Sequence, residues 1–279
     1  MMQNSGLGNG FREVARAVVR FNSSGTVEVR HGWTEMGQGV HTVAMQVAIE
    51  ELGIDPASVR VIVDTTRQLG FGQTTGSRGT LMAAASVKDA CDKALADGCR
   101  KDVDYTGEFV VDWTQHLGDP EHPNPTIHAA FGYAAQMVVA DRASGDIERV
   151  LAVHDVGRAV NPLLCEGQIE GSVHMGLGYA LTEQFPHDPE TGFPVNTTLR
   201  SLGILRAKDV PQIDVQLVEV PQPRSPYGIK GVGEIGLVPT APAVAAALHE
   251  LDGVWRNELP MRAASARRFA AICTRWVRT

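Results

Sequence analysis

Apolar and polar residues follow two different periods in the first third of the chain. They alternate over two short stretches that flank the turn Asn22-Ser23-Ser24-Gly25, a pattern that predicts a β-hairpin. Further along, Val43 and Val47 recur at helical spacing. The elements predicted for this part are strands at 15–21, 26–30 and 59–63 and helices at 41–52 and 80–96.

The pattern breaks over residues 97–126, where three prolines within 117–126 predict a loop. Strand and helix patterns resume after it, and Thr240 is predicted to be a helix N-cap, with Pro242 in the first turn. The elements predicted for this part are strands at 133–140, 147–154 and 213–220 and helices at 162–183, from 240 onward, and at 263–275. Hairpins mixed with helices indicate an α+β fold with mixed sheets and packed helices, rather than a doubly wound sheet.

The proline-rich loop is also the best candidate for a domain boundary. We therefore predict a first α+β subdomain over residues 1–110, a linker over 111–126 and a second α+β subdomain over 127–279. No sequence repeat relates the two subdomains.

Composition and charge exclude several classes of protein. The chain has 279 residues, of which 43% are hydrophobic and 20% charged, so it has enough apolar residues for a core and disorder is disfavoured. A net charge of −7 without a basic block argues against nonspecific binding to nucleic acid or a membrane surface. No apolar run reaches the roughly 18–20 residues of a membrane span, and the first twenty residues do not resemble a signal peptide.

Cysteine and histidine spacing predicts no metal site built from side chains. The cysteines are far apart and form no C-x-x-C pair, so neither an iron–sulfur or zinc site nor a disulfide framework is expected within the chain, which fits a cytoplasmic protein. His116, His122 and His128 are six residues apart, which is not a metal signature, and we expect them to be solvated. The four cysteines are Cys91, Cys99, Cys165 and Cys273.

Glycine clusters carry most of the functional signal. Gly37 and Gly39 flank Gln38 before a predicted helix, where exposed N–H groups suit an anion such as a phosphate; the alternative is a tight strand-to-helix turn. A second cluster, residues 70–80, combines glycines and hydroxyls with Arg78 before the next helix. It suits oxyanion binding, or it is a solvated loop with Thr80 as the N-cap.

A third cluster places four glycines within residues 167–178, inside a helical pattern. Each mid-helix glycine costs roughly 1 kcal/mol relative to alanine, so about 4 kcal/mol must be offset. Close helix packing and close approach of a cofactor both remain open as explanations.

The fourth cluster contains GVGEIG (231–236), which matches G-x-G-x-x-G literally. We reject a dinucleotide site because a proline-rich segment, rather than a strand, precedes it and the helix begins only near Thr240. Glu234 would also stand where a pyrophosphate belongs. A carboxylate between glycines on a tight turn suits a base in a pocket; the alternative is a surface glutamate on a loop.

Taken together, five ordered motifs resemble the molybdenum-cofactor domain of the xanthine dehydrogenase and aldehyde oxidase family. The resemblance covers nearly the whole chain. The sequences GSRGT and YGIKGVGEIGLVPTAPAVAAAL are most similar to those of the bacterial selenium-dependent purine or xanthine hydroxylases. The motifs are EMGQGVHT (35–42), TGSRGT (75–80), HDVGRAVNP (154–162), GQIEGSVHMGLGYALTE (167–183) and KGVGE (230–234).

The resemblance implies a molybdopterin cofactor, expected as the cytosine dinucleotide, with no protein side chain bound to molybdenum. It implies that Gln38, between Gly37 and Gly39, and Gln168 contact the pterin or its phosphate. It also implies that Glu234, after Gly233, is the catalytic base beside the metal. The loop expected to wrap the cofactor contains Ser77, Arg78, Gly79 and Thr80.

The activity implied by the resemblance is hydroxylation, with water, of an electron-poor C–H carbon in a purine, another N-heterocycle or an aldehyde, as in purine catabolism. Only 34 residues precede Glu35, whereas family enzymes have a long segment there. We therefore expect this chain to be the C-terminal part of a molybdenum subunit. Its expected partners are the N-terminal part of that subunit, an iron–sulfur subunit and a flavin (FAD) subunit.

Two other functions offer alternatives. A cofactor-free fragment that only folds or binds a partner chain is distinguished from a hydroxylase by its cofactor content. A nicotinamide dehydrogenase using residues 231–236 fails on strand context.

Overall fold

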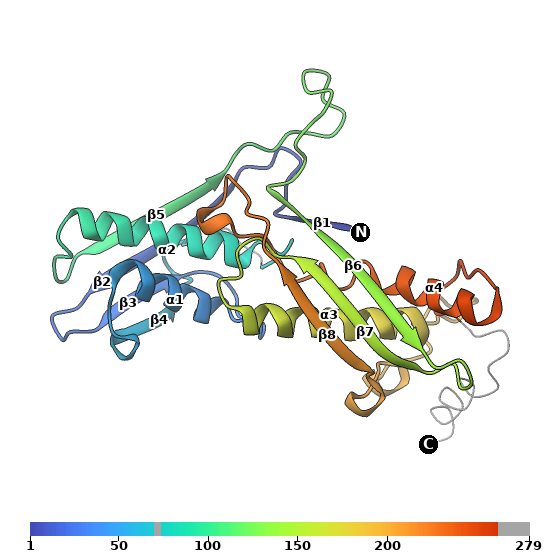
Figure 1. Ribbon diagram of the computed structural model, residues 1–279. Coiled ribbons are helices and arrows are strands. Elements are labelled where there is room, and N and C mark those ends of the chain that lie inside the picture. The colour runs from blue at the N-terminus through green and yellow to red at the C-terminus, as the bar shows by residue number, and fades with distance from the viewer. Residues whose placement is uncertain (70–73, 262–279) are drawn as a thin grey trace.

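The computed structural model describes residues 1–69 and 74–261, which contain eight strands and four α-helices (Figure 1). The strands are β1 (Met2–Ser5), β2 (Glu13–Phe21), β3 (Val27–His31), β4 (Val59–Val63), β5 (Asp104–Val111), β6 (Ala130–Ala140), β7 (Ile147–Asp155) and β8 (Gln212–Val218). The helices are α1 (Val40–Leu52), α2 (Gly79–Ala96), α3 (Pro162–Leu181) and α4 (Thr240–Asp252).

The first sheet has the strand order β4-β3-β2-β5, and α1 and α2 pack on it. β2 pairs antiparallel with β3 and β5, whereas β3 pairs parallel with β4 through the α1 crossover. Apolar residues of β2 meet those of both helices in a core that buries Val19, Val29, Trp33 and Met82.

The second sheet has the order β1-β6-β7-β8, with α3 and α4 packed on it. β6 pairs antiparallel with β1 and β7, and β7 pairs parallel with β8 through the α3 crossover. Ile169, Val173 and Leu177 of α3 are buried against Val150 and Val244.

The two sheets share one connectivity. In each, an antiparallel hairpin is followed by a helical crossover to a parallel strand and then by a second helix. In the first sheet, β5 pairs with β2, the first strand of the hairpin. In the second sheet, the corresponding position beside β6 is taken by β1, which comes from the N-terminus of the chain. The topology therefore repeats although the sequence does not.

The α+β class and the mixed sheets predicted from the sequence are confirmed. The predicted elements between residues 15 and 252 are present, most with ends within three residues of those expected. Two strands were missed, β1 and β5. Thr240 begins α4, but its side chain does not cap the helix, because Oγ1 donates to the Gly236 carbonyl. The helix predicted at 263–275, Cys273 and residues 70–73 of the second glycine cluster lie outside the described residues.

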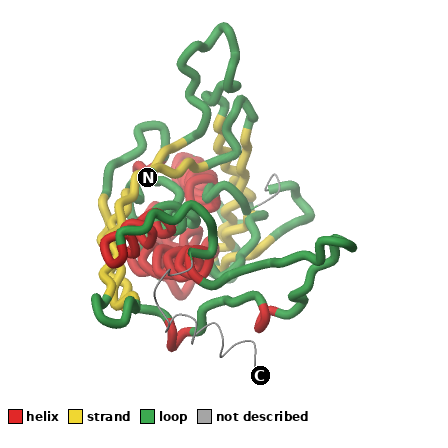
Figure 2. Tube along the Cα trace, turned by 90° about the vertical axis from the view of Figure 1, so that its right-hand side faces the viewer, coloured by secondary structure: helices red, strands yellow, loops and turns green. Residues whose placement is uncertain are grey.

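Residues 112–129 form a loop that projects from the body of the molecule between β5 and β6 (Figures 1 and 2). The division into 1–110, 111–126 and 127–279 remains a prediction. β1 differs from this division: its residues belong to the predicted first subdomain, but it pairs in the second sheet.

Candidate functional site

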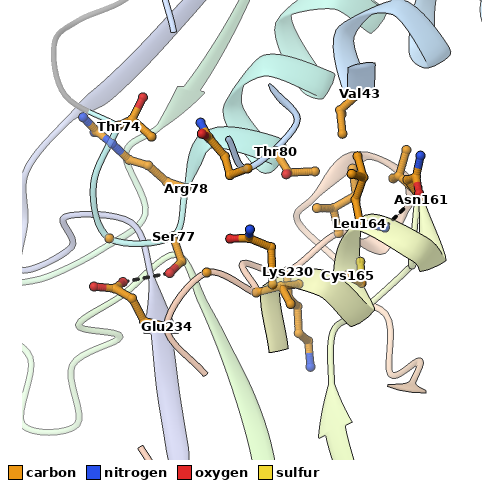
Figure 3. A pocket seen from close by; sticks show the side chains of 18 of the residues that line it. Val43, Thr74, Ser77, Arg78, Thr80, Asn161, Leu164, Cys165, Lys230 and Glu234 are labelled. Carbon is orange, nitrogen blue, oxygen red and sulfur yellow. Dashed lines mark hydrogen bonds between the residues drawn. The ribbon is translucent and has the colours of Figure 1, made fainter. Parts of the chain in front are cut away.

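A cavity of about 280 Å³ lies where the first turns of α2 and α3 meet the loop that carries residues 229–234 (Figure 3). Hydroxyl, amide and glycine residues dominate one side, and Val43, Val160 and Leu164 give it an apolar side. The structure brings eight of the predicted site residues to this cavity: Gln38, Ser77, Arg78, Gly79, Thr80, Gln168, Gly233 and Glu234. Gly37 and Gly39 are not among the residues that line it.

Glu234 lies on the turn between the cavity loop and α4, and its side chain is exposed. Ser77 Oγ donates to Glu234 Oε2 over 2.7 Å, as the dashed line in Figure 3 shows. Ser77 has a left-handed backbone, with φ of 47°, and its loop packs directly on the Glu234 loop. A Cβ on Gly231 would lie 1.9 Å from the Ser77 carbonyl oxygen, so only glycine allows this approach. The sequence assigned Ser77 to cofactor binding; in the structure its hydroxyl contacts the predicted base.

The start of α1 holds an anion supplied by the chain itself. Glu35 Oε1 accepts from the N–H groups of Gly37 and Gly39, both at 2.8 Å, and Oε2 accepts from His41 N–H at 3.3 Å. Although burial raises the pKa of Glu35, the three N–H bonds together bring it below its usual value. One interpretation of the sequence directed the Gly37 and Gly39 N–H groups at an external phosphate, and the other placed them in a tight turn; within the described structure they bond Glu35.

Gln38 lines the cavity, but its amide is bonded within its own loop. Oε1 accepts from Met36 N–H at 2.5 Å, and Nε2 donates to the Thr34 carbonyl at 2.8 Å. A ligand contact by this amide therefore requires exchange of one of these bonds.

The start of α2 differs from the start of α1. Arg78 is its N-cap, and no side chain caps it, so Thr80 is not the cap that the alternative interpretation supposed. The guanidinium of Arg78 is buried, bonds Glu13 Oε2 at 2.6 Å and lies 5.4 Å from the Trp33 ring centre. Arg78 thus links the loop before α2 to β2, while Gly79 and Thr80 at the helix start line the cavity.

The glycines of α3 have two different environments. A Cβ on Gly176 would lie 2.5 Å from Thr240 Cβ, so packing of α3 on α4 requires this glycine, whereas a Cβ on Gly178 would meet only the end of the Glu183 side chain. Gly167 and Gly171 have nothing within 4 Å of the Cβ position. Close packing therefore explains Gly176 among the four glycines, and Gln168 lies on the cavity at the start of the same helix.

Residues that sequence reasoning missed hold the cavity together. Lys230 Nζ donates to Asp155 Oδ2 over 2.6 Å, and both side chains are 7% exposed. Asp155 Oδ1 also accepts from Gly157 N–H, which fixes the end of β7. The presence of Lys230 and Asp155 in two of the glycine-containing motifs was the available signal, but 75 residues separate them. His154, which the sequence places beside Asp155, instead contacts Gln136.

Two buried histidines predict acid sensitivity. Burial lowers the pKa of His31 and of His154 from 6.5 to about 4, and His31 Nδ1 accepts from Trp33 N–H, which requires the neutral ring. The unfolded chain therefore binds more protons between pH 6.5 and 4. We expect the free energy of unfolding to fall by about 1.4 kcal/mol per pH unit for each histidine as pH drops through this window. Urea unfolding at several pH values measures it. His31→Gln should remove the contribution of one of the two histidines from this slope.

Within residues 1–69 and 74–261, no group of three or more His, Cys, Asp or Glu side chains is arranged to hold a metal ion. No helix in those ranges has the length and apolar character to cross a membrane.

Comparison with known proteins places the chain among cofactor-binding domains. Residues 1–101 and 93–211 match the model of the molybdopterin cofactor-binding domain family. The chain is 30% identical to a putative xanthine dehydrogenase molybdenum-binding subunit of Escherichia coli, in an alignment that covers 89% of this chain and 38% of that protein. It is 28% identical to a probable xanthine dehydrogenase subunit of Bacillus subtilis, over 93% of this chain and 40% of the relative. The chain thus spans about two fifths of the length of these relatives.

Solved structures share the fold. An aldehyde oxidoreductase from Desulfovibrio desulfuricans superposes with a TM-score of 0.80 at 24% identity, over 95% of this chain and 31% of that one. An aldehyde oxidoreductase from Desulfovibrio gigas gives a TM-score of 0.77 at 26% identity, over 93% and 30%.

Proposed function

Because this chain belongs to the molybdopterin cofactor-binding domain family, we propose that it forms part of a molybdenum hydroxylase subunit. The proposed reaction is hydroxylation of an electron-poor C–H carbon in a purine, another N-heterocycle or an aldehyde. The observation that carries the proposal is the cavity itself. It brings Glu234 together with the starts of α2 and α3, which are far apart in the sequence.

The cavity residues fit a molybdopterin. The hydroxyls of Thr74, Thr75 and Thr80 and the amide of Gln168 line it, together with the uncapped start of α2, which favours an anion. We propose that Gln168 and the 77–80 loop hold the pterin and its phosphate, with Gln38 contributing after local exchange of its bonds. When bound, the group would supply the redox centre that accepts the electrons of the oxidised carbon.

Glu234 is proposed to act as the general base. Its carboxylate lies at the cavity, and the bond from Ser77 Oγ to one of its oxygens orients it there. A general base in this position takes a proton and typically contributes ~10²–10⁴-fold to rate. Val43, Val160 and Leu164 form the apolar side of the cavity.

We propose the cytosine dinucleotide form of the cofactor, with iron–sulfur and FAD groups on partner chains. The cavity of about 280 Å³ is slightly smaller than the ~300–1,000 Å³ common for ligand pockets. That size suits the pterin part of the cofactor and leaves the remaining wall to another chain.

The proposed partners are the N-terminal part of the molybdenum subunit, an iron–sulfur subunit and a flavin subunit. One face of α3 supports a protein contact: Leu163, Met175 and Tyr179 are 77%, 56% and 54% exposed. Gly167 and Gly171 lie between them on one i, i+4 row that winds along the exposed side of the helix, and they leave this row flat. We propose that the N-terminal part of the subunit packs here, because relatives carry about three fifths of their length outside the matched region.

We also propose a cytoplasmic location, which the three free cysteines of the described residues support. The alternative function is a cofactor-free fragment that folds and binds a partner, which the same exposed α3 face would serve.

The molybdenum and pterin content of the chain, purified gently from its host, tests the proposal. We expect close to one molybdenum per chain, together with a larger partner. Met175→Glu should lose the partner, whereas Met137→Glu, at a strand residue of similar exposure (57%), should keep it. A chain that carries a partner without molybdenum would establish the cofactor-free alternative.

A further inference from the structure

The turn that carries Glu234 depends on contacts from distant segments. Residues 230–239 lie between a short helical turn and α4 and form neither a strand nor an α-helix. Within the turn, Leu237 N–H donates to the Glu234 carbonyl at 3.1 Å. The position of Glu234 must therefore be set largely from outside the turn.

Ser172 of α3 reaches the peptide that leads into Glu234. Its hydroxyl donates to the Gly233 carbonyl over 2.9 Å, and the residue is 6% exposed. The Gly233 carbonyl belongs to the planar peptide unit whose nitrogen is that of Glu234. Fixing this oxygen therefore fixes the direction in which the chain enters the Glu234 Cα.

The surrounding packing strengthens this contact. A Cβ on Gly236 would lie 2.6 Å from Ser172 Cβ, so the turn sits directly on the helix. Gln136 Nε2 of β6 also donates to the Gly236 carbonyl, at 2.8 Å. Ser172 lies four residues after Gln168, so one rigid helix bears both the cavity amide and the support of the turn.

The hydroxyl of Ser172 differs from that of a serine which only satisfies its own helix. Ser86 of α2 shows the ordinary arrangement: its Oγ donates to the Met82 and Ala83 carbonyls of the preceding turn, at 2.9 and 3.1 Å. Ser86 is fully buried in a helix but supports no loop. It provides a matched reference for the loss of a buried helical hydroxyl.

We propose that Ser172 is a positioning residue, which holds Glu234 at the distance from Gln168 that the reaction requires. The inference rests on the proposed function, because it assigns Ser172 a role through Glu234. Ser172 acts on the backbone of the turn, whereas Ser77 acts on the carboxylate, so two separate segments hold the base by different atoms.

The test compares Ser172→Ala with Ser86→Ala in the molybdenum-loaded complex. We expect Ser172→Ala to lower kcat by about 10- to 100-fold, since a displacement of about 1 Å costs on the order of 10²-fold. KM and molybdenum content should stay near those of the unaltered protein, and the amides of residues 233–237 should exchange faster with solvent. Ser86→Ala should change none of these quantities.

The proposal is overturned if kcat of Ser172→Ala stays within about twofold of Ser86→Ala. Loss of molybdenum or of folding in Ser172→Ala would also overturn it, by making Ser172 a structural residue. Glu234→Gln separates the two levels of inference. If that variant keeps turnover, the assignment of Glu234 as the base fails; if it is inactive while Ser172→Ala is unaffected, only the positioning role fails. The proposed function fails separately, if the unaltered protein and its partner hold no molybdenum.

Discussion

Replacement of Glu234 by glutamine is expected to lower turnover by ~10²–10⁴-fold while molybdenum and pterin stay bound. Glutamine keeps the size of the side chain, and its amide oxygen still accepts a hydrogen bond from Ser77 Oγ. The change removes the negative charge and with it the ability to take up a proton. The measurements are steady-state turnover with a heterocyclic or aldehyde substrate and metal analysis of the same sample.

Glu170→Gln is the matched control, because Glu170 is an exposed carboxylate of α3 that does not line the cavity. It should keep full turnover. Retention of most turnover in Glu234→Gln would contradict the assignment of the base. Loss of molybdenum in Glu234→Gln would instead give the residue a part in cofactor binding.

Local signals predicted the order of elements well, because most of this chain obeys them. The helix α3 illustrates this: Asn161 caps it, Pro162 follows as its first residue, and apolar residues recur along its buried face. The strand β5 was missed although its burial alternates, since Gly107 weakens the strand pattern. That glycine is required by packing: a Cβ there would lie 2.0 Å from the Ser86 carbonyl oxygen of α2. Only the folded structure reveals this constraint.

The candidate site was predictable in its members but not in their contacts. Motif resemblance named residues that the fold brings to one cavity, yet the partners of those residues come from elsewhere. Glu35 begins one of the motifs but had no predicted role, and it bonds the Gly37 and Gly39 N–H groups, which one of two interpretations directed at a phosphate. Ser172 and Lys230 act through bonds to residues 61 and 75 positions away. Contacts between residues so far apart depend on how helices and sheets pack, and this packing cannot be inferred from the spacing of residues along the sequence.

One such long-range contact joins the loop before α2, which lines the cavity, to β2. Glu13 begins β2, and its carboxylate is buried, with the side chain 1% exposed. Oε2 accepts from Arg78, while Oε1 accepts from the N–H groups of Leu7 and Gly8 at 2.8 and 3.2 Å. The same carboxylate therefore secures the segment after β1 and the N-cap of α2, 65 residues further on.

Glu13→Gln is expected to lower the free energy of unfolding by about 3–5 kcal/mol, because it leaves the buried Arg78 charge without its carboxylate. Glutamine retains an acceptor for Leu7 and Gly8, so the loss reports mainly on the ion pair. Glu108→Gln is the control: its pair with Arg16 joins β2 to β5 at the surface, the side chains are 39% and 34% exposed, and a loss of about 0–1 kcal/mol is expected. Urea unfolding at pH 7.5 measures both variants, and equal losses would show that burial of the Glu13–Arg78 pair has no special effect.

Because Arg78 is the N-cap of the helix that begins at the cavity, the Glu13 variant should also retain less molybdenum than the Glu108 variant.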